Sequence, residues 1–164
     1  MIQSMPDNPK DKELLRAALA VARRSMDKGN LPFGCLMTDT EGNVIEEGEN
    51  TVVTTKDSIA HCEINLVHKL AGKFDFQFLE SCTVYASTEP CPMCTAALFW
   101  AGIGRIVFAL SKDRYHSIAR TTNPSHLFDL SAKNMLYYAK RPVKISGPLL
   151  EAEAAELYTA WLSG

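Results

Sequence analysis

The sequence predicts an α/β fold in which helices cover a mixed sheet of about five strands. Apolar residues recur at helical spacing near the start, a hairpin pattern follows, and helical and strand patterns then alternate to the end. At 164 residues, the chain has the length of one domain, 1–164. A domain of that size buries roughly 70% of its unfolded surface, so it needs neither disulfides nor a metal simply to fold.

The first third of the chain is expected to form an arm, a helix and a hairpin. Residues 1–9 contain two prolines and little that packs, which predicts a loose arm. A helix is expected over 11–28, where apolar side chains recur every three or four positions and Gly29 follows. Two β-rich stretches then flank residues 40–42, which predicts a hairpin.

The rest of the chain is expected to alternate helices and strands. A second helix is predicted over about 58–71, capped by Asp57 or Ser58 and stopped by Gly72. Residues 111–127 show no regular pattern. The remaining expected elements are a strand at 82–88, a short buried helix at 93–101, a buried strand at 105–110, a helix at 128–139, a short strand at 143–147 and a closing helix at 149–162.

Composition and charge indicate an ordinary globular protein. The net charge of −2 argues against a strong electrostatic grip on nucleic acid. The opening residues have no apolar core of a signal peptide, and no apolar run reaches the length of a membrane span, so neither is expected. The odd number of cysteines, five, predicts reduced thiols in the cytoplasm, available for a metal or for catalysis.

Two short motifs carry the chemistry. His61, Cys62 and Glu63 stand at the start of a predicted helix, and Cys91 and Cys94 follow thirty positions later as a C-x-x-C unit after a strand. Two cysteines three apart share one helix face, and the positive end of a helix lowers a thiol pKa. One imidazole and two thiolates form a ligand set typical of zinc, and a catalytic zinc keeps its fourth position for water. Glu63 can face that open position without binding the ion.

The pattern His-x-Glu followed by Pro-Cys-x-x-Cys resembles that of the cytidine deaminase-like superfamily. Within it, the chain is similar to the branch that holds guanine deaminases, tRNA adenosine deaminases and fungal cytosine deaminases. The resemblance runs from about Leu14 to Trp161 and includes Phe33 before the first strand and Asn50 after the hairpin. It implies a cytidine deaminase-like fold, a three-layer α-β-α sandwich.

The resemblance also implies a reaction. One Zn²⁺ per chain would be held by His61, Cys91 and Cys94 together with a water or hydroxide. Glu63 would take the water proton, pass it to a ring nitrogen and protonate the departing amine, so that ammonia is released. Members of this branch are commonly homodimers, and the apolar run 96–100 would suit such an interface or the core.

The resemblance to this branch defines the substrate less closely than it defines the reaction. Trp100 falls where guanine deaminases carry tryptophan, which favours a guanine deaminase-like enzyme of purine metabolism. A tRNA adenosine deaminase, or a deaminase of cytosine or another amino-heterocycle, remains an alternative, although the mild acidity of the chain speaks against RNA. The stretch 117–129 lacks the acidic run of guanine deaminases and offers only Asp129, and Cys62 replaces the usual alanine. The candidate substrate-binding residues are Asn50, Phe33, Cys62, Trp100 and Asp129.

Other interpretations of these residues are weighed beside the enzyme. A purely structural zinc would need a fourth protein ligand, for which Cys62 and Cys82 are the candidates. A redox role for the C-x-x-C unit leaves His61 and Glu63 unexplained. A zinc-binding module without catalysis has no use for Glu63 as a proton shuttle. Trp100 is expected either in the core or stacked on a substrate ring.

Overall fold

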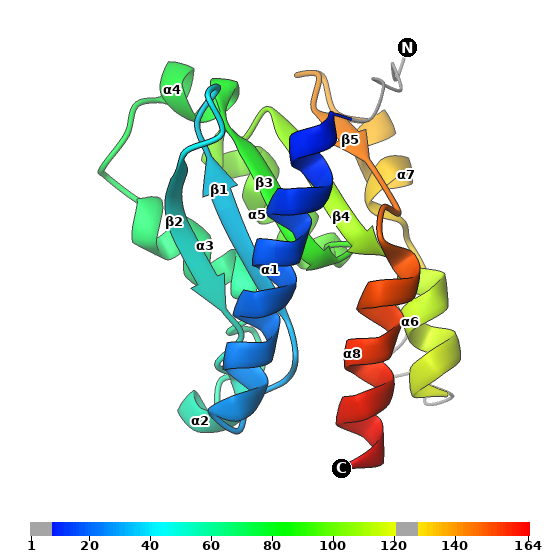
Figure 1. Cartoon of the computed structure of the whole chain (residues 1–164). Helices are drawn as coiled ribbons and strands as arrows, with labels where there is room; N and C mark the ends of the chain where they lie inside the picture. Colours follow the sequence, from blue (N-terminus) through cyan, green and yellow to red (C-terminus); the bar gives the residue numbers. More distant parts are fainter. Residues whose placement is uncertain (1–7, 121–127) are drawn as a thin grey trace.

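The computed structural model describes residues 8–120 and 128–164, and within them a five-stranded sheet lies between two layers of helices (Figure 1). The strands are β1 (Gly34–Thr38), β2 (Val44–Glu49), β3 (Thr83–Thr88), β4 (Arg105–Leu110) and β5 (Lys144–Ser146). Their order is β2-β1-β3-β4-β5. β1 pairs antiparallel with β2 and β3, whereas β3, β4 and β5 run parallel, so the sheet is mixed. The predicted fold class is confirmed.

Helices cover both faces of the sheet. In the order of the chain they are α1 (Pro9–Asp27), α2 (Val52–Thr55), α3 (Cys62–Leu70), α4 (Phe76–Ser81), α5 (Pro92–Ala101), α6 (Lys112–Ala119), α7 (Ala132–Tyr137) and α8 (Glu151–Ser163). α1, α6 and α8 lie on one face, and α3, α5 and α7 lie on the other (Figure 1).

Side chains that alternate along the strands build one apolar cluster on each face. Leu36 and Tyr85 pair across β1 and β3 and pack with α1 and α8. Their neighbours Cys35 and Ala86 also pair, and they pack with α3 and α5 on the opposite face. Successive strand residues point to opposite faces, so a sheet that is buried on both sides needs an unbroken apolar run, and VYA and IVFAL provide it.

Four helices begin two or more residues away from the expected start, among them α7 at Ala132 rather than 128 and α8 at Glu151 rather than 149. α1 begins at Pro9, inside the predicted arm, because the Asn8 side chain caps it by accepting the N–H of Lys10 at 3.0 Å. The rest of that arm, residues 1–7, lies outside the described residues. α3 begins at Cys62 rather than 58, because Asp57 instead closes a turn by accepting the N–H groups of Ile59 and Ala60.

Three helices were not expected. α6 occupies part of the stretch predicted to be irregular, and residues 121–127 lie outside the described part of the chain. Only Tyr115 and Ile118 of α6 pack inward, which leaves too little apolar pattern to detect. α2 is a single turn, and two of its N–H groups donate to the side chain of Asn30, which is more than twenty residues away in the sequence. α4 is only six residues long, and Asp75 is its N-cap residue.

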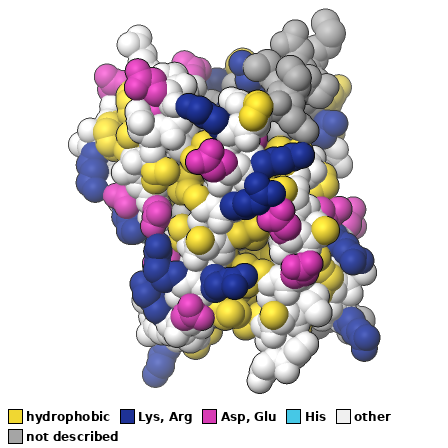
Figure 2. All heavy atoms as spheres, viewed as in Figure 1, with side chains coloured by type: hydrophobic (Ala, Val, Ile, Leu, Met, Phe, Trp, Pro, Cys, Tyr) yellow, Lys and Arg dark blue, Asp and Glu magenta, His cyan; other side chains and the backbone are white. Residues whose placement is uncertain are grey.

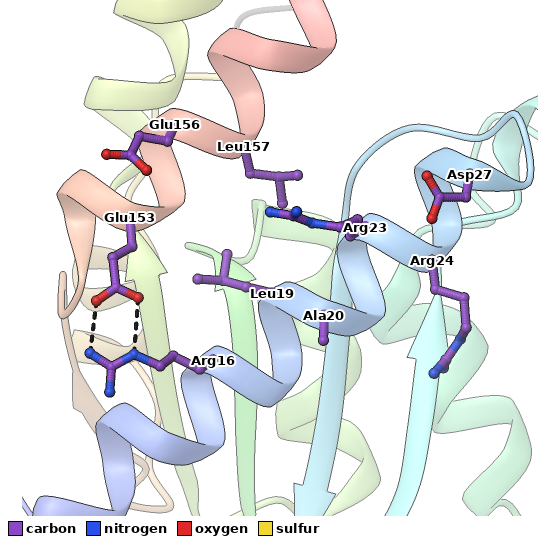
Figure 3. A pocket seen from close by; sticks show the side chains of 9 residues that line it. All are labelled: Arg16, Leu19, Ala20, Arg23, Arg24, Asp27, Glu153, Glu156 and Leu157. Carbon is purple, nitrogen blue, oxygen red and sulfur yellow. Dashed lines mark hydrogen bonds and ion pairs between the residues drawn. The ribbon is translucent and has the colours of Figure 1, made fainter.

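The face that α1 and α8 form is open to solvent. Both signs of charge are interspersed over it (Figure 2). A groove of about 400 Å³ runs between the two helices, with Leu19, Ala20 and Leu157 among its lining residues and an ion pair from Arg16 to Glu153 at one end (Figure 3). Among the described residues, no helix is both long and apolar enough to cross a membrane.

Candidate metal and catalytic site

Two helix N-termini bring the metal-ligating residues together. His61 is the N-cap residue of α3, and Cys91 is the N-cap residue of α5, which follows the end of β3. Both have extended backbone, as residues just before a helix do, and Pro92 then starts α5. Cys94 lies in the first turn of α5 and is fully buried. The positive ends of both helices therefore point toward the same group of side chains, which favours thiolates there.

The three side chains fit one zinc ion. The ligand atoms of His61, Cys91 and Cys94 lie within 4.8 Å of one another. His61 Nδ1 is 3.7 Å from Cys91 Sγ and 3.5 Å from Cys94 Sγ. A sulfur and a nitrogen bound to the same tetrahedral zinc are separated by roughly 3.5 Å, given ordinary zinc–ligand bond lengths. The donor types and the spacing both suit zinc, the cofactor of this chain.

The group has three protein ligands among the described residues. Cys62 and Cys82, the candidates for a fourth, are not part of it. The Cys82 thiol instead donates to the Phe78 carbonyl oxygen at 3.2 Å. A three-ligand set leaves one tetrahedral position for solvent or substrate, which is the arrangement of catalytic zinc sites.

The electrostatics of the two thiols favour metal binding. A hydrogen bond from Cys94, together with one from His61, lowers the pKa of Cys91 to about 4. The same contact with Cys91, followed by burial, raises the pKa of Cys94. The hydrogen bond to Cys91 raises the pKa of His61. One thiolate thus forms readily, and a metal cation would ionise the second.

Glu63 lies beside this group on the first turn of α3. Its side chain is buried, with 6% of the residue exposed, and burial raises its pKa against the opposing effect of a hydrogen bond from Cys62. A raised pKa makes a carboxylate a better proton acceptor than an exposed one. The proton-transfer role of Glu63 stays a prediction.

Cys62 points into the protein rather than to solvent. It is 2% exposed, and its thiol donates to Glu63 Oε2 at 3.1 Å. It belongs to the same apolar cluster as Cys35. Burial raises the pKa of Cys62 well above the usual range. Direct contact between Cys62 and the substrate stays a prediction.

Asn50 and Phe33 lie side by side, as the Asn50 N–H donates to the Phe33 carbonyl oxygen at 3.1 Å. Asn50 is almost fully buried, and its Oδ1 accepts the N–H of Val52 at 3.1 Å. Phe33 packs against both Tyr115 and Tyr158, with ring centroids 5.4 and 5.5 Å away. These contacts fix the orientation of the Asn50 carboxamide, whose nitrogen is the atom left to donate.

The other two candidate substrate residues lie in exposed places. Trp100 is 80% exposed at the end of α5 and stacks edge-on against Phe99. α5 is therefore buried along only part of its surface, which differs from the expected buried helix. Asp129 is exposed and forms an ion pair with Lys112, which also pairs with Asp113. The structure does not bring either residue into contact with the metal-ligating group.

Sequence reasoning missed two side chains, Tyr158 and Glu89, that hold the metal loop, which is the segment 89–91 between β3 and α5. Tyr158 of α8 places its buried hydroxyl within hydrogen-bond distance of Ser87 and Thr88 at the end of β3. Glu89, the next residue, accepts the N–H of Lys112 at 3.0 Å and the N–H of Ala132 at 2.9 Å. The available signal was the position of Glu89 just before the Pro-Cys motif.

The sequence matches the family model described as the cytidine and deoxycytidylate deaminase zinc-binding region over residues 8–110. A probable cytosine deaminase from Schizosaccharomyces pombe is 35% identical over 145 residues, which is 88% of each chain. A guanine deaminase from Bacillus subtilis is 34% identical over 58% of this chain and 61% of its own length. A tRNA-specific adenosine deaminase from Aquifex aeolicus is 30% identical over 66% and 72%.

Solved structures share the fold. A guanine deaminase from Nitrosomonas europaea superposes with a TM-score of 0.77 at 22% identity, covering 98% of this chain and 87% of its own. A tRNA:A34 deaminase superposes with a TM-score of 0.69 at 22% identity, covering 89% and 99%. At such low identity, these likenesses establish the fold and leave the substrate open.

Proposed function

We propose that a free nucleobase is the substrate of this chain, which belongs to the zinc-dependent cytidine and deoxycytidylate deaminase family and is therefore a hydrolytic deaminase. The observation that carries the deamination chemistry is the buried Glu63 carboxylate next to the three ligand atoms of His61, Cys91 and Cys94. The choice of a free base is supported by the cytosine deaminase and guanine deaminase relatives. A proton shuttle beside a metal with an open position is suited to the addition of water to an amine-bearing ring carbon.

The proposed roles follow from the chemistry of each side chain. His61, Cys91 and Cys94 hold zinc, which when bound makes a water molecule acidic enough to lose a proton at about pH 7. Glu63 would accept that proton and give it to a ring nitrogen of the base. It would then take the proton of the hydroxyl group that has been added to the ring carbon and pass it to the amine, which leaves as ammonia. Water and the amino-heterocycle are consumed, and the oxo-heterocycle and ammonia are formed.

Asn50 is proposed to recognise an acceptor atom of the base. Because its Oδ1 already accepts the Val52 N–H, Nδ2 is the atom available to a ligand, and an amide nitrogen only donates. The group that it recognises is then a carbonyl oxygen or an unprotonated ring nitrogen. Cytosine and guanine carry both, so the contact suits either base.

Cytosine is the first candidate substrate and guanine the second. The sequence-based preference for guanine depended on Trp100, and an 80% exposed side chain gives that argument no support. Cytosine is favoured by the relative from S. pombe, a probable cytosine deaminase that aligns with 88% of this chain. Guanine is favoured by the B. subtilis relative at nearly the same identity over a shorter stretch. Both of these relatives are named as deaminases of a free base and not of a folded RNA.

The test is ammonia release by the zinc-loaded protein from a panel of bases, nucleosides and an anticodon stem-loop. We expect the highest kcat/KM for a free base, with cytosine ahead of guanine and with cytidine and guanosine far behind. Inosine formation in the stem-loop, with no release from free bases, would contradict the proposal and assign the chain to tRNA.

We also propose that two copies of this chain form a homodimer through the layer that holds α5 and α7. Trp100, Tyr137 and Tyr138 are between 72% and 80% exposed, and they lie on α5 and α7 in one layer of the fold. Exposed aromatic side chains that gather on one layer are typical of protein interfaces. A second copy of the chain is the partner expected there.

A further inference from the structure

We propose that Cys62 is a positioning residue for Glu63, because its thiol holds the buried carboxylate in the orientation that proton transfer requires. The inference deepens the proposed function and rests on it. It concerns the residue that stands between His61 and Glu63 at the start of α3.

The contact is direct and closed to solvent. The Cys62 thiol donates to Glu63 Oε2 at 3.1 Å, and the two residues are 2% and 6% exposed. Among the ion pairs of the described residues, none involves Glu63, so no lysine or arginine orients its carboxylate there. A buried carboxylate needs hydrogen-bond donors, and a thiol is a weak but real one.

Zinc binding would leave Cys62 as the thiol able to donate to Glu63. Two thiols approach the Glu63 carboxylate in the structure, those of Cys62 and Cys94. Cys94 is a metal-ligating residue, and a thiol bound to zinc has lost its proton and cannot donate. Cys62 is not in the ligand group, and its thiol lies within hydrogen-bond distance of the Glu63 carboxylate.

Packing fixes the position of Cys62. Gly48 of β2 lies against the start of α3, and a Cβ added at Gly48 would meet the Cys62 carbonyl oxygen at 2.2 Å and Cys35 Sγ at 3.0 Å. β2 and α3 therefore approach each other as closely as a glycine allows at this point. Cys62 packs in the same apolar cluster as Cys35, and its thiol contacts Glu63.

The kinetic test compares Cys62→Ala with Cys62→Ser, which keeps a donor of similar size. With zinc content equal to that of the wild type, we expect Cys62→Ala to lower kcat by about fivefold to tenfold, the effect of one lost hydrogen bond, while KM changes less than about twofold. Cys62→Ser should restore kcat. The matched control is Cys82→Ala, which removes a buried thiol from the same apolar cluster and should keep both constants.

Equal loss of kcat in Cys62→Ala and Cys62→Ser would overturn the proposal, as would unchanged kcat in Cys62→Ala. The infrared S–H stretching band gives a readout without substrate, because a thiol that donates absorbs at lower frequency. We expect a shifted component in the zinc-loaded wild type that disappears in Cys62→Ser and in Glu63→Ala and persists in Cys82→Ala. A wild-type spectrum without that component would refute the hydrogen bond even if the substrate were misassigned.

Discussion

At the scale of single residues, Glu63 is a buried carboxylate two positions after His61, beside the metal-ligating group. Replacing Glu63 with Gln keeps the shape of the side chain but removes its ability to take up a proton. We expect Glu63→Gln to bind zinc normally and to lower kcat by about 10² to 10⁴. Zinc analysis and steady-state ammonia release measure the two quantities. Turnover close to that of the wild type would exclude Glu63 from proton transfer.

At the scale of elements, Glu89 ties the metal loop to two helices. Its carboxylate accepts the first N–H of α6, from Lys112, and the first N–H of α7, from Ala132. Negative charge at a helix N-terminus is favourable, and here one side chain serves two helices two residues before Cys91. The start of α5, which presents the two thiols, is therefore coupled to the helices that follow it.

Replacing Glu89 with Gln would put an amide NH₂ against one of these N–H donors. We expect Glu89→Gln to lower the free energy of unfolding by about 1–3 kcal/mol, because a buried donor loses its partner. Urea denaturation measures this change. Glu80→Gln, at an exposed position of α4, is the control and should leave stability unchanged. Equal stability of the two variants would show that the Glu89 contacts contribute nothing.

At the scale of the whole molecule, a buried ion pair joins the start of α1 to β4. Asp11 is fully buried, and its carboxylate accepts from Arg105 Nη2 at 2.8 Å and from the Tyr85 hydroxyl at 2.9 Å. Burial raises the pKa of Asp11, but the hydrogen bonds from Arg105 and Tyr85 and the charge of Arg105 outweigh it and lower the pKa overall. α1 is thus fastened to the sheet by a group that must stay ionised.

A pKa that is lower in the folded than in the unfolded chain stabilises the fold above the unfolded value of about 4, and this stability is lost as the pH falls through the folded pKa. We expect Asp11→Asn to cost about 3–5 kcal/mol at pH 7, because Arg105 is left unpaired, and to lose less further stability below pH 4 than the wild type does. Asp27→Asn, exposed on the same helix, is the control. The free energy of unfolding of the wild type and of Asp11→Asn is measured between pH 3 and 7. If the two values fall in parallel as the pH drops, Asp11 has no part in acid unfolding.

Assembly is also a property of the whole molecule. We expect light scattering at micromolar concentration to give the mass of two chains, and Trp100→Glu to give the mass of one, because a charge would be buried in the interface. Leu162→Glu, on exposed α8 in the opposite layer, should remain dimeric. A wild-type protein with the mass of one chain would end the dimer proposal.

The sequence alone predicted the sheet and the hairpin, and it predicted His61, Cys91 and Cys94 as a ligand set that the structure brings together. Strand alternation and the spacing of Cys91 and Cys94 are local patterns, whereas His61 was joined to the two cysteines through the family motif. The tertiary structure decided what depends on contacts between distant segments. Asn30 caps α2, and Glu89 accepts hydrogen bonds from the starts of α6 and α7. Trp100 is exposed to solvent, and the Cys62 thiol donates to Glu63. A residue's partner across the fold leaves no periodic signal in the chain, because only packing selects it.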